Sequence, residues 1–159
     1  MDFTKITKPE MQVVGIEGRT KNDLEASPVT AKIPGLWSRF FREKRAEEID
    51  YRKDDSSLLG AYTNYESDHT GFYTLIVGGE VSKLGMISKG MVGITIPAAE
   101  YLVFPAPGKM PEAIIMAWSN IWKHFSQNAA YQRAYTTDFE LYRTTDDGQT
   151  EAEIYIAVR

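Results

Sequence analysis

The order of the predicted elements repeats: a strand, a helix and two further strands occur once in each half of the chain. In the first half, the strand 12–18 precedes a helix that begins near Pro34, and strands 57–65 and 71–81 follow. β-Branched residues favour these strands, and proline fits a first helical turn because no backbone N–H is needed there. The chain is therefore predicted to contain two β-α-β-β units rather than a series of unrelated elements.

The second half repeats this order with different residues. An extended stretch that is interrupted near Pro97 precedes a helix starting at Pro111, which stops at Ser126-Gln127-Asn128. Two strands close the chain and are joined by a turn at residues 146–148. Two such units commonly share one sheet and place both helices on the same face.

We therefore predict an α+β fold: an antiparallel sheet with pseudo-two-fold symmetry, built from a tandem β-α-β-β repeat, with a groove between two helices on one face. The whole chain, residues 1–159, is expected to form a single domain, with repeat one at about 10–82 and repeat two at about 90–159. We expect no DNA-binding domain, because both halves are assigned to the repeat.

The overall composition excludes several classes of protein. The chain has 159 residues, of which 43% are hydrophobic, enough for one sizeable core. A net charge of −4 argues against direct nucleic-acid binding, and the lack of cysteine excludes disulfides and thiol catalysis. No apolar run approaches the ~20 residues that span a bilayer, and no signal peptide is recognisable. We expect a cytoplasmic protein with no membrane partner.

Metal and cofactor chemistry have no support in the sequence. The two histidines, His69 and His124, lie in different halves and have no metal-ligand spacing around them. Neither a nucleophile elbow nor a phosphate-binding loop is present. We expect no metal, no cofactor and no catalytic residue that spacing alone would identify.

Aromatic residues, 12% of the chain, are the unusual feature of its composition. Trp37 and Phe40 lie on the apolar stripe of the first helix, and Trp118 and Trp122 on that of the second. Such stripes are more often simple core, although a groove between two helices would expose the edge of each stripe. The strand tyrosines at 62, 73, 142 and 155 could each belong to the core, the surface or a groove lining.

Glu140, in the stretch TTDFELYR, is the most informative charged residue. Side chains alternate along a strand, so Glu140 shares a face with Asp138 and Tyr142, whereas Phe139 and Leu141 share the other. This alternation alone predicts that Phe139 and Leu141 face the core and that Glu140 faces solvent.

Four segments in order along the chain resemble a known family: LLGAYTNY with GFYTLIVGGEV, then IPAAEYLVFPAPG, then AWSNIWKHF, then AYTTDFELY with AEIYIAV. Together they resemble the gyrase-inhibitory-protein-like effector-binding domain, which also follows the DNA-binding part of AraC-type and MerR-type regulators. The likeness extends over nearly the whole chain and is greatest to the stand-alone branch, which includes integron-cassette effector-binding proteins.

The resemblance implies that Glu140 points into the groove and meets a small, amphipathic or lipophilic cation. The protein would then be a sensor or a sequestering module for such ligands. The candidate ligand-binding residues are Glu140, Trp118, Trp37, Tyr62, Tyr73, Phe40, Trp122, Tyr142, Tyr155 and Glu100.

Two other functions remain open at this point. The chain could be an inhibitor that docks on a topoisomerase or a transcription regulator, or a hydrolase that uses a buried Glu140. If Glu140 does point inward, Phe139 and Leu141 need cover from elsewhere, and a homodimer would be one way to provide it.

Overall fold

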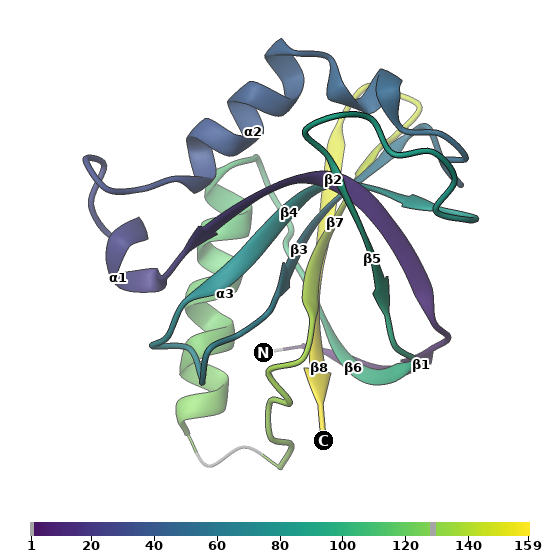
Figure 1. Cartoon of the computed structure of the whole chain (residues 1–159). Coiled ribbons are helices and arrows are strands. Elements are labelled where there is room, and N and C mark those ends of the chain that lie inside the picture. The colour runs from purple at the N-terminus through teal and green to yellow at the C-terminus, as the bar shows by residue number, and fades with distance from the viewer. Residues whose placement is uncertain (1, 128–129) are drawn as a thin grey trace.

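A computed structural model, which describes residues 2–127 and 130–159, contains one sheet of eight strands in the order β1-β6-β8-β7-β3-β4-β2-β5 (Figure 1). The strands are β1 (Thr4–Lys8), β2 (Met11–Thr20), β3 (Ser57–Thr63), β4 (Tyr73–Val81), β5 (Val92–Ile96), β6 (Ala99–Pro105), β7 (Asp138–Thr144) and β8 (Thr150–Val158). All neighbouring strands are antiparallel. The predicted α+β class is confirmed.

The strand order has the predicted pseudo-two-fold symmetry. The second half contributes β6-β8-β7, the first half contributes β3-β4-β2, and the two halves meet where β7 pairs with β3. The sequence did not predict β1, and it indicated β5 and β6 only as one interrupted extended stretch. Strand β1 pairs with β6 and β5 pairs with β2, so each half lends its first strand to the other.

A proline follows each exchanged strand. Pro9 lies between β1 and β2, and Pro97 lies between β5 and β6. Proline has no backbone N–H to donate to a ladder, so it interrupts a strand and lets the chain change its pairing partner. The interruption predicted near Pro97 is this crossing from one half of the sheet to the other.

The two long helices, α2 (Ile33–Arg42) and α3 (Glu112–Ser126), cover the same face of the sheet (Figure 1). Helix α2 buries Leu36 and Phe40, whereas Trp37, predicted on the same stripe as Phe40, is half-buried. Helix α3 buries the small residues Ala113 and Ala117 together with Ile121. The predicted α3 terminus is correct at Ser126, although Asn128 lies outside the described residues. No helix within the described ranges is long and apolar enough to cross a membrane.

A short helix, α1 (Asn22–Glu25), was not predicted, and it fixes the start of α2. The Glu25 carboxylate accepts hydrogen bonds from the backbone N–H groups of Lys32 and Ile33, at 2.8 and 3.1 Å. These two N–H groups lie at the beginning of α2, where no helical carbonyl can accept from them. A single-turn 3-10 helix (η1, Arg45–Glu48) follows α2.

The other face of the sheet is also covered, because the sheet curls onto itself. Ile6 of edge strand β1 and Ile94 of the opposite edge strand β5 pack into the same cluster. Phe139 lies in this cluster, with its ring stacked on Tyr155 at 4.4 Å and at 5.4 Å from the ring of Tyr101. The cover expected from a homodimer is therefore supplied within the chain, and that reason for expecting a dimer no longer holds.

The Phe139 stack predicts a large effect on stability. Phe139→Ala removes a fully buried ring and is expected to lower the free energy of unfolding by about 3–5 kcal/mol. Leu141→Ala, on the same face but half-buried, is the matched control and should cost clearly less. Denaturant unfolding followed by circular dichroism measures both, and equal losses for the two variants would contradict this assignment of the core.

Candidate functional site

Glu140 lies at the centre of the sheet, on the face that carries the helices. Its side chain is only 3% exposed, and its partner in the register across the seam between the two halves is Gly60 of β3. The absence of a side chain at Gly60 leaves room for the carboxylate. A β-carbon there would lie 3.1 Å from Glu140 Oε1 and 3.1 Å from Cζ2 of Trp37.

The burial of Glu140 contradicts the strand alternation and agrees with the family resemblance. Alternation identifies the solvent side of a strand only when one face of the sheet is wet. Here Phe139 faces the curled interior and Glu140 faces the layer of helices. Both faces of β7 are covered, so one of them buries a charged residue.

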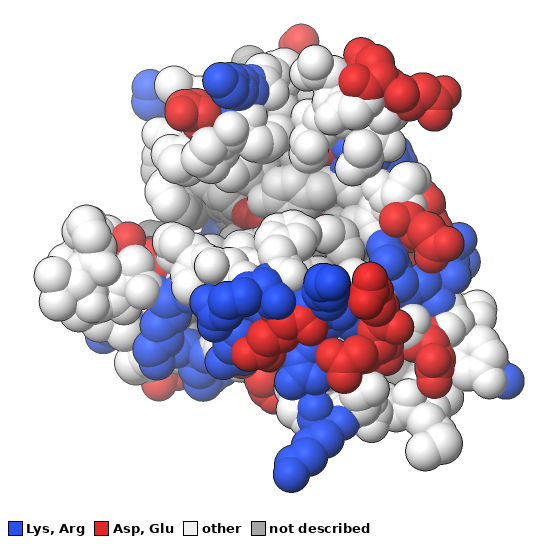
Figure 2. Space-filling view, turned by 90° about the horizontal axis from the view of Figure 1, so that it is seen from above, with Lys and Arg blue, Asp and Glu red and all other residues white. Residues whose placement is uncertain are grey.

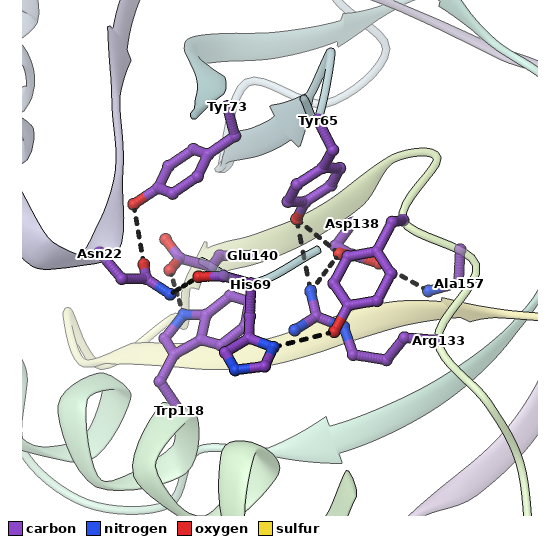
Figure 3. Close-up of polar contacts among 10 residues, drawn as sticks. Asn22, Tyr65, His69, Tyr73, Trp118, Arg133, Asp138, Glu140 and Ala157 are labelled. Carbon is purple, nitrogen blue, oxygen red and sulfur yellow. Dashed lines mark hydrogen bonds and ion pairs between the residues drawn. The ribbon is translucent and has the colours of Figure 1, made fainter. Parts of the chain in front are cut away.

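Three uncharged donors hold the Glu140 carboxylate. The Tyr62 hydroxyl donates to Oε2 at 2.8 Å, and the Trp118 indole Nε1 donates to the same oxygen at 2.6 Å. The Tyr142 hydroxyl donates to Oε1 at 2.7 Å. Figure 3 shows the Trp118 indole directed at the carboxylate from α3. These bonds replace part of the water that the carboxylate loses, but they bring no positive charge.

The neighbouring buried carboxylate, Asp138, is treated differently. It is fully buried and forms an ion pair with Arg133, which is itself only 7% exposed, at 2.7 Å. Tyr65 and the backbone N–H of Ala157 donate to it as well, at 2.6 and 2.8 Å (Figure 3). Among the described residues, no such cation pairs with Glu140. One strand thus holds a neutralised carboxylate and a carboxylate without a counter-charge.

Electrostatics at Glu140 follow from this arrangement. Burial raises the pKa of the Glu140 carboxyl, and the hydrogen bonds from Tyr142, Trp118 and Tyr62 oppose that rise without cancelling it. Burial, with the negative charge of Glu140 adding to it, also raises the pKa of Tyr62 and Tyr142 far above the usual range. Both phenols therefore remain protonated and keep donating to the carboxylate.

Aromatic rings enclose the carboxylate on both sides. Trp37 from α2 lies edge-on to the ring of Tyr142, with centroids 5.2 Å apart. The ring centroid of Trp118, from α3, lies 5.3 Å from that of Tyr62, and the ring centroid of Tyr73 lies 5.4 Å from that of Tyr62. Trp37, Trp118 and Tyr142 are half-buried, so the rings above the carboxylate reach the surface.

The surface of the molecule is hollowed on the side seen from above (Figure 2). Figure 2 shows a hollow between two masses of side chains, with an acidic group visible in its depth. Charged side chains gather on its outer flank, whereas those around the hollow are mostly uncharged. An apolar ligand with one positive charge would match this distribution.

The other predicted site residues lie away from the carboxylate. Phe40 is completely buried in the core beneath α2, and Tyr155 lies on the opposite face of the sheet, stacked on Phe139. Glu100 is an exposed carboxylate near the sheet edge, paired with Lys5 at 3.2 Å. Trp122 is 44% exposed and leans on Trp118 with ring centroids 6.0 Å apart, so it can only be a rim residue.

The sequence reasoning missed two features of the site. Gly60 was not singled out, although a glycine inside a strand often marks a close approach of another group. Asp138 and its partner Arg133 were also missed, although Asp138 shares the face of Glu140. Nothing in the local sequence identifies Arg133 as its counter-ion, because that pairing depends on the loop before β7.

A second hollow, with a volume of about 490 Å³, lies at the far end of β7 and β8. Its lining includes Leu141, Arg143 and Glu153. The two charged side chains are 54% and 40% exposed, and they face each other at 3.8 Å. Their charges are therefore hydrated and balanced, and this hollow offers no desolvated group to a ligand.

Comparisons with known proteins identify relatives of the whole chain. Residues 6–158 match the family described as integron-associated effector binding protein. YobU of Bacillus subtilis (strain 168), named as a candidate transcriptional regulator, is 28% identical over 100% of this chain and 99% of its own.

Solved structures share the fold. The integron cassette protein VCH_CASS2 from the mobile metagenome of Vibrio cholerae has a TM-score of 0.79 and 34% identity, over 99% of this chain and 95% of its own. SAV2435 bound to tetraphenylphosphonium also has a TM-score of 0.79, over 100% of this chain and 94% of its own. At 23% identity, the likeness to SAV2435 concerns the fold alone.

The raised pKa of Glu140 predicts a pH-dependent difference in stability between the wild type and Glu140→Gln. Between the unfolded and the higher folded pKa, the folded wild type binds more protons than the unfolded chain, so its stability falls as pH rises. The glutamine side chain does not titrate. Its oxygen can accept from Tyr62 and Trp118, and its NH₂ can donate to a reversed Tyr142 hydroxyl.

The free energy of unfolding of Glu140→Gln should therefore exceed that of the wild type by an amount that grows as pH rises through this window. Urea unfolding at a series of pH values measures the difference, and other titrating groups cancel from it. Glu153→Gln, which removes an exposed carboxylate, is the control and should show no such trend. A difference between the wild type and Glu140→Gln that is independent of pH would show that Glu140 is not a desolvated carboxylate.

Proposed function

The chain belongs to the family of integron-associated effector binding proteins, and on that premise we propose that it binds small lipophilic cations in the groove between α2 and α3. Bound ligand would be sequestered there or signalled to a partner protein. One observation carries the proposal: Glu140 is a buried carboxylate whose three hydrogen-bond donors are all uncharged.

The physical basis is the missing counter-charge. Interactions between charges are weakly screened where water is excluded, so a cation next to Glu140 is attracted more strongly than at the surface. Arg133 already fills this role for Asp138, whereas the place beside Glu140 is left for a ligand. The same strand therefore provides an internal comparison between a satisfied and an unsatisfied carboxylate.

The walls favour a cation that is also apolar. Trp37, Trp118 and Tyr142 are half-buried and bring aromatic surface to the carboxylate, whereas Tyr62 and Tyr73 are buried in the adjoining core. Each ring face that meets a cation contributes roughly 0.5–2 kcal/mol, depending on how far the pair is desolvated. A hydrated ion would have to shed its water, whereas a lipophilic cation has little water to lose. The walls thus select for apolar surface and the carboxylate for positive charge.

Tetraphenylphosphonium is the natural probe, since it is the ligand of SAV2435, which has the same fold. Tetraphenylborate has nearly the same shape with the opposite charge, so it separates recognition of charge from recognition of apolar surface. We expect the wild type to bind tetraphenylphosphonium and to reject tetraphenylborate.

Glu140→Gln should weaken the binding of tetraphenylphosphonium at least ~10-fold, because the uncharged side chain keeps the shape of the site and loses its attraction for cations. Glu153→Gln should bind like the wild type, since it removes an exposed carboxylate elsewhere. Isothermal titration calorimetry measures all three affinities. Equal affinity of the wild type and Glu140→Gln for the cation would refute the proposed mechanism.

Binding should also depend on pH. The protonated Glu140 carboxyl offers no counter-charge, so affinity for tetraphenylphosphonium should fall as pH decreases through the raised pKa of the free protein. The cation favours the ionised form, so binding within that range should release a proton. Titrations in buffers with different ionisation enthalpies measure the release, and Glu140→Gln should show a flat profile. A wild-type affinity that stays constant down to acid unfolding would contradict the prediction.

Two outcomes would support the other functions considered from the sequence. Stable association with a topoisomerase or a transcription regulator, unaffected by the cation, would favour an inhibitor. Multiple turnover of an ester substrate that is lost in Glu140→Gln would favour a hydrolase.

A further inference from the structure

The two tryptophans that flank Glu140 are held in different ways. The Trp118 indole is fixed by its hydrogen bond to the carboxylate, at 2.6 Å. Within residues 2–127 and 130–159, no hydrogen bond holds the Trp37 indole. Its ring is half-buried, and its stacking neighbour Phe41, at 6.0 Å, is itself 59% exposed. One wall of the groove is thus tethered by a hydrogen bond, and the other is held by apolar packing.

The two oxygens of Glu140 also differ. Oε2 accepts two hydrogen bonds, from Tyr62 and Trp118, whereas Oε1 accepts one, from Tyr142. A carboxylate oxygen can accept two, so the remaining capacity lies on Oε1. This oxygen is the one that approaches the position above Gly60, where a β-carbon would lie 3.1 Å from it.

The edge of Trp37 reaches the same space. Its Cζ2 atom and Oε1 of Glu140 lie at equal distances, 3.1 Å, from the point where a β-carbon of Gly60 would be. The edge of an aromatic ring carries the positive end of its quadrupole, and its faces carry the negative part. The ring edge therefore brings weak positive charge toward Oε1, the oxygen of Glu140 that accepts only one hydrogen bond.

We propose that the space above Gly60 is the subsite for the cationic centre of the ligand, and that in the free protein the edge of Trp37 occupies it as a weak substitute. This inference rests on the proposed function and makes it more specific. Trp37 must leave the carboxylate when the ligand binds and then stacks against the ligand from the side. Its lack of a hydrogen bond makes this displacement easy, whereas Trp118 stays in place.

Nuclear Overhauser effects between protons report this displacement directly in the wild-type protein. In the free protein we expect a cross-peak between the Trp37 Hζ2 proton and the Gly60 α-protons, since Cζ2 lies beside that residue. At saturating tetraphenylphosphonium this cross-peak should disappear, and cross-peaks between the phenyl protons of the ligand and Gly60 should replace it. The Trp118 indole N–H signal should persist in its hydrogen-bonded position.

Persistence of the Trp37–Gly60 cross-peak in the saturated complex would overturn the inference. The proposed function would survive that result as long as binding still depended on Glu140. Equal binding of the cation by wild type and Glu140→Gln would instead remove both. The two failures are therefore distinguishable.

A variant at Gly60 gives a second test. Gly60→Ala places a methyl group 3.1 Å from both the Trp37 edge and Glu140 Oε1, so it should fill the subsite, displace the Trp37 edge and weaken tetraphenylphosphonium binding at least ~10-fold. Gly18→Ala is the matched control: it also lies beneath α2, but its new methyl group would meet Leu36 at an ordinary 3.5 Å. Gly18→Ala should bind like the wild type. Unchanged affinity in Gly60→Ala would refute the location of the subsite.

Discussion

The groove depends on a carboxylate that the protein solvates with hydrogen bonds but does not neutralise. Tyr62, Tyr142 and Trp118 come from β3, β7 and α3, and all three donate to Glu140. A buried charge without partners would be too costly to keep, and a paired one would have nothing to offer a ligand. The three donors offset part of the cost of burying the charge, and because none of them is a cation, the carboxylate can still pair with a cationic ligand.

Symmetry explains where this carboxylate is located. The two halves meet at the pairing of β3 and β7, and there Gly60 faces Glu140. One half contributes an acid to this pair and the other a glycine, so the seam holds a single charge and leaves room for its side chain.

Much of the fold could be predicted from the sequence because it depends on local periodicity. The apolar spacing of α2 and the proline at its start identify that helix, and the runs around β3, β4, β7 and β8 identify strands. The exchange of β1 and β5 could not be predicted, since a five-residue strand does not encode its pairing partner. Burial of Glu140 was ambiguous for a related reason: alternation distinguishes two faces but cannot say that both are covered. The resemblance to a known family, rather than periodicity, indicated the correct orientation.

The exchanged strands also have a consequence for how the site comes into existence. Strand β1, at the start of the chain, finds its ladder partner only when β6 has been made, and the chain must reach β7 before Glu140 can face Gly60. The groove thus joins sequence segments that are far apart. A ligand bound in the groove would stabilise the junction between the halves, since a molecule that binds only the native state shifts the unfolding equilibrium toward the native state. Ligand binding in the groove should therefore stabilise the pairing of the two halves against unfolding.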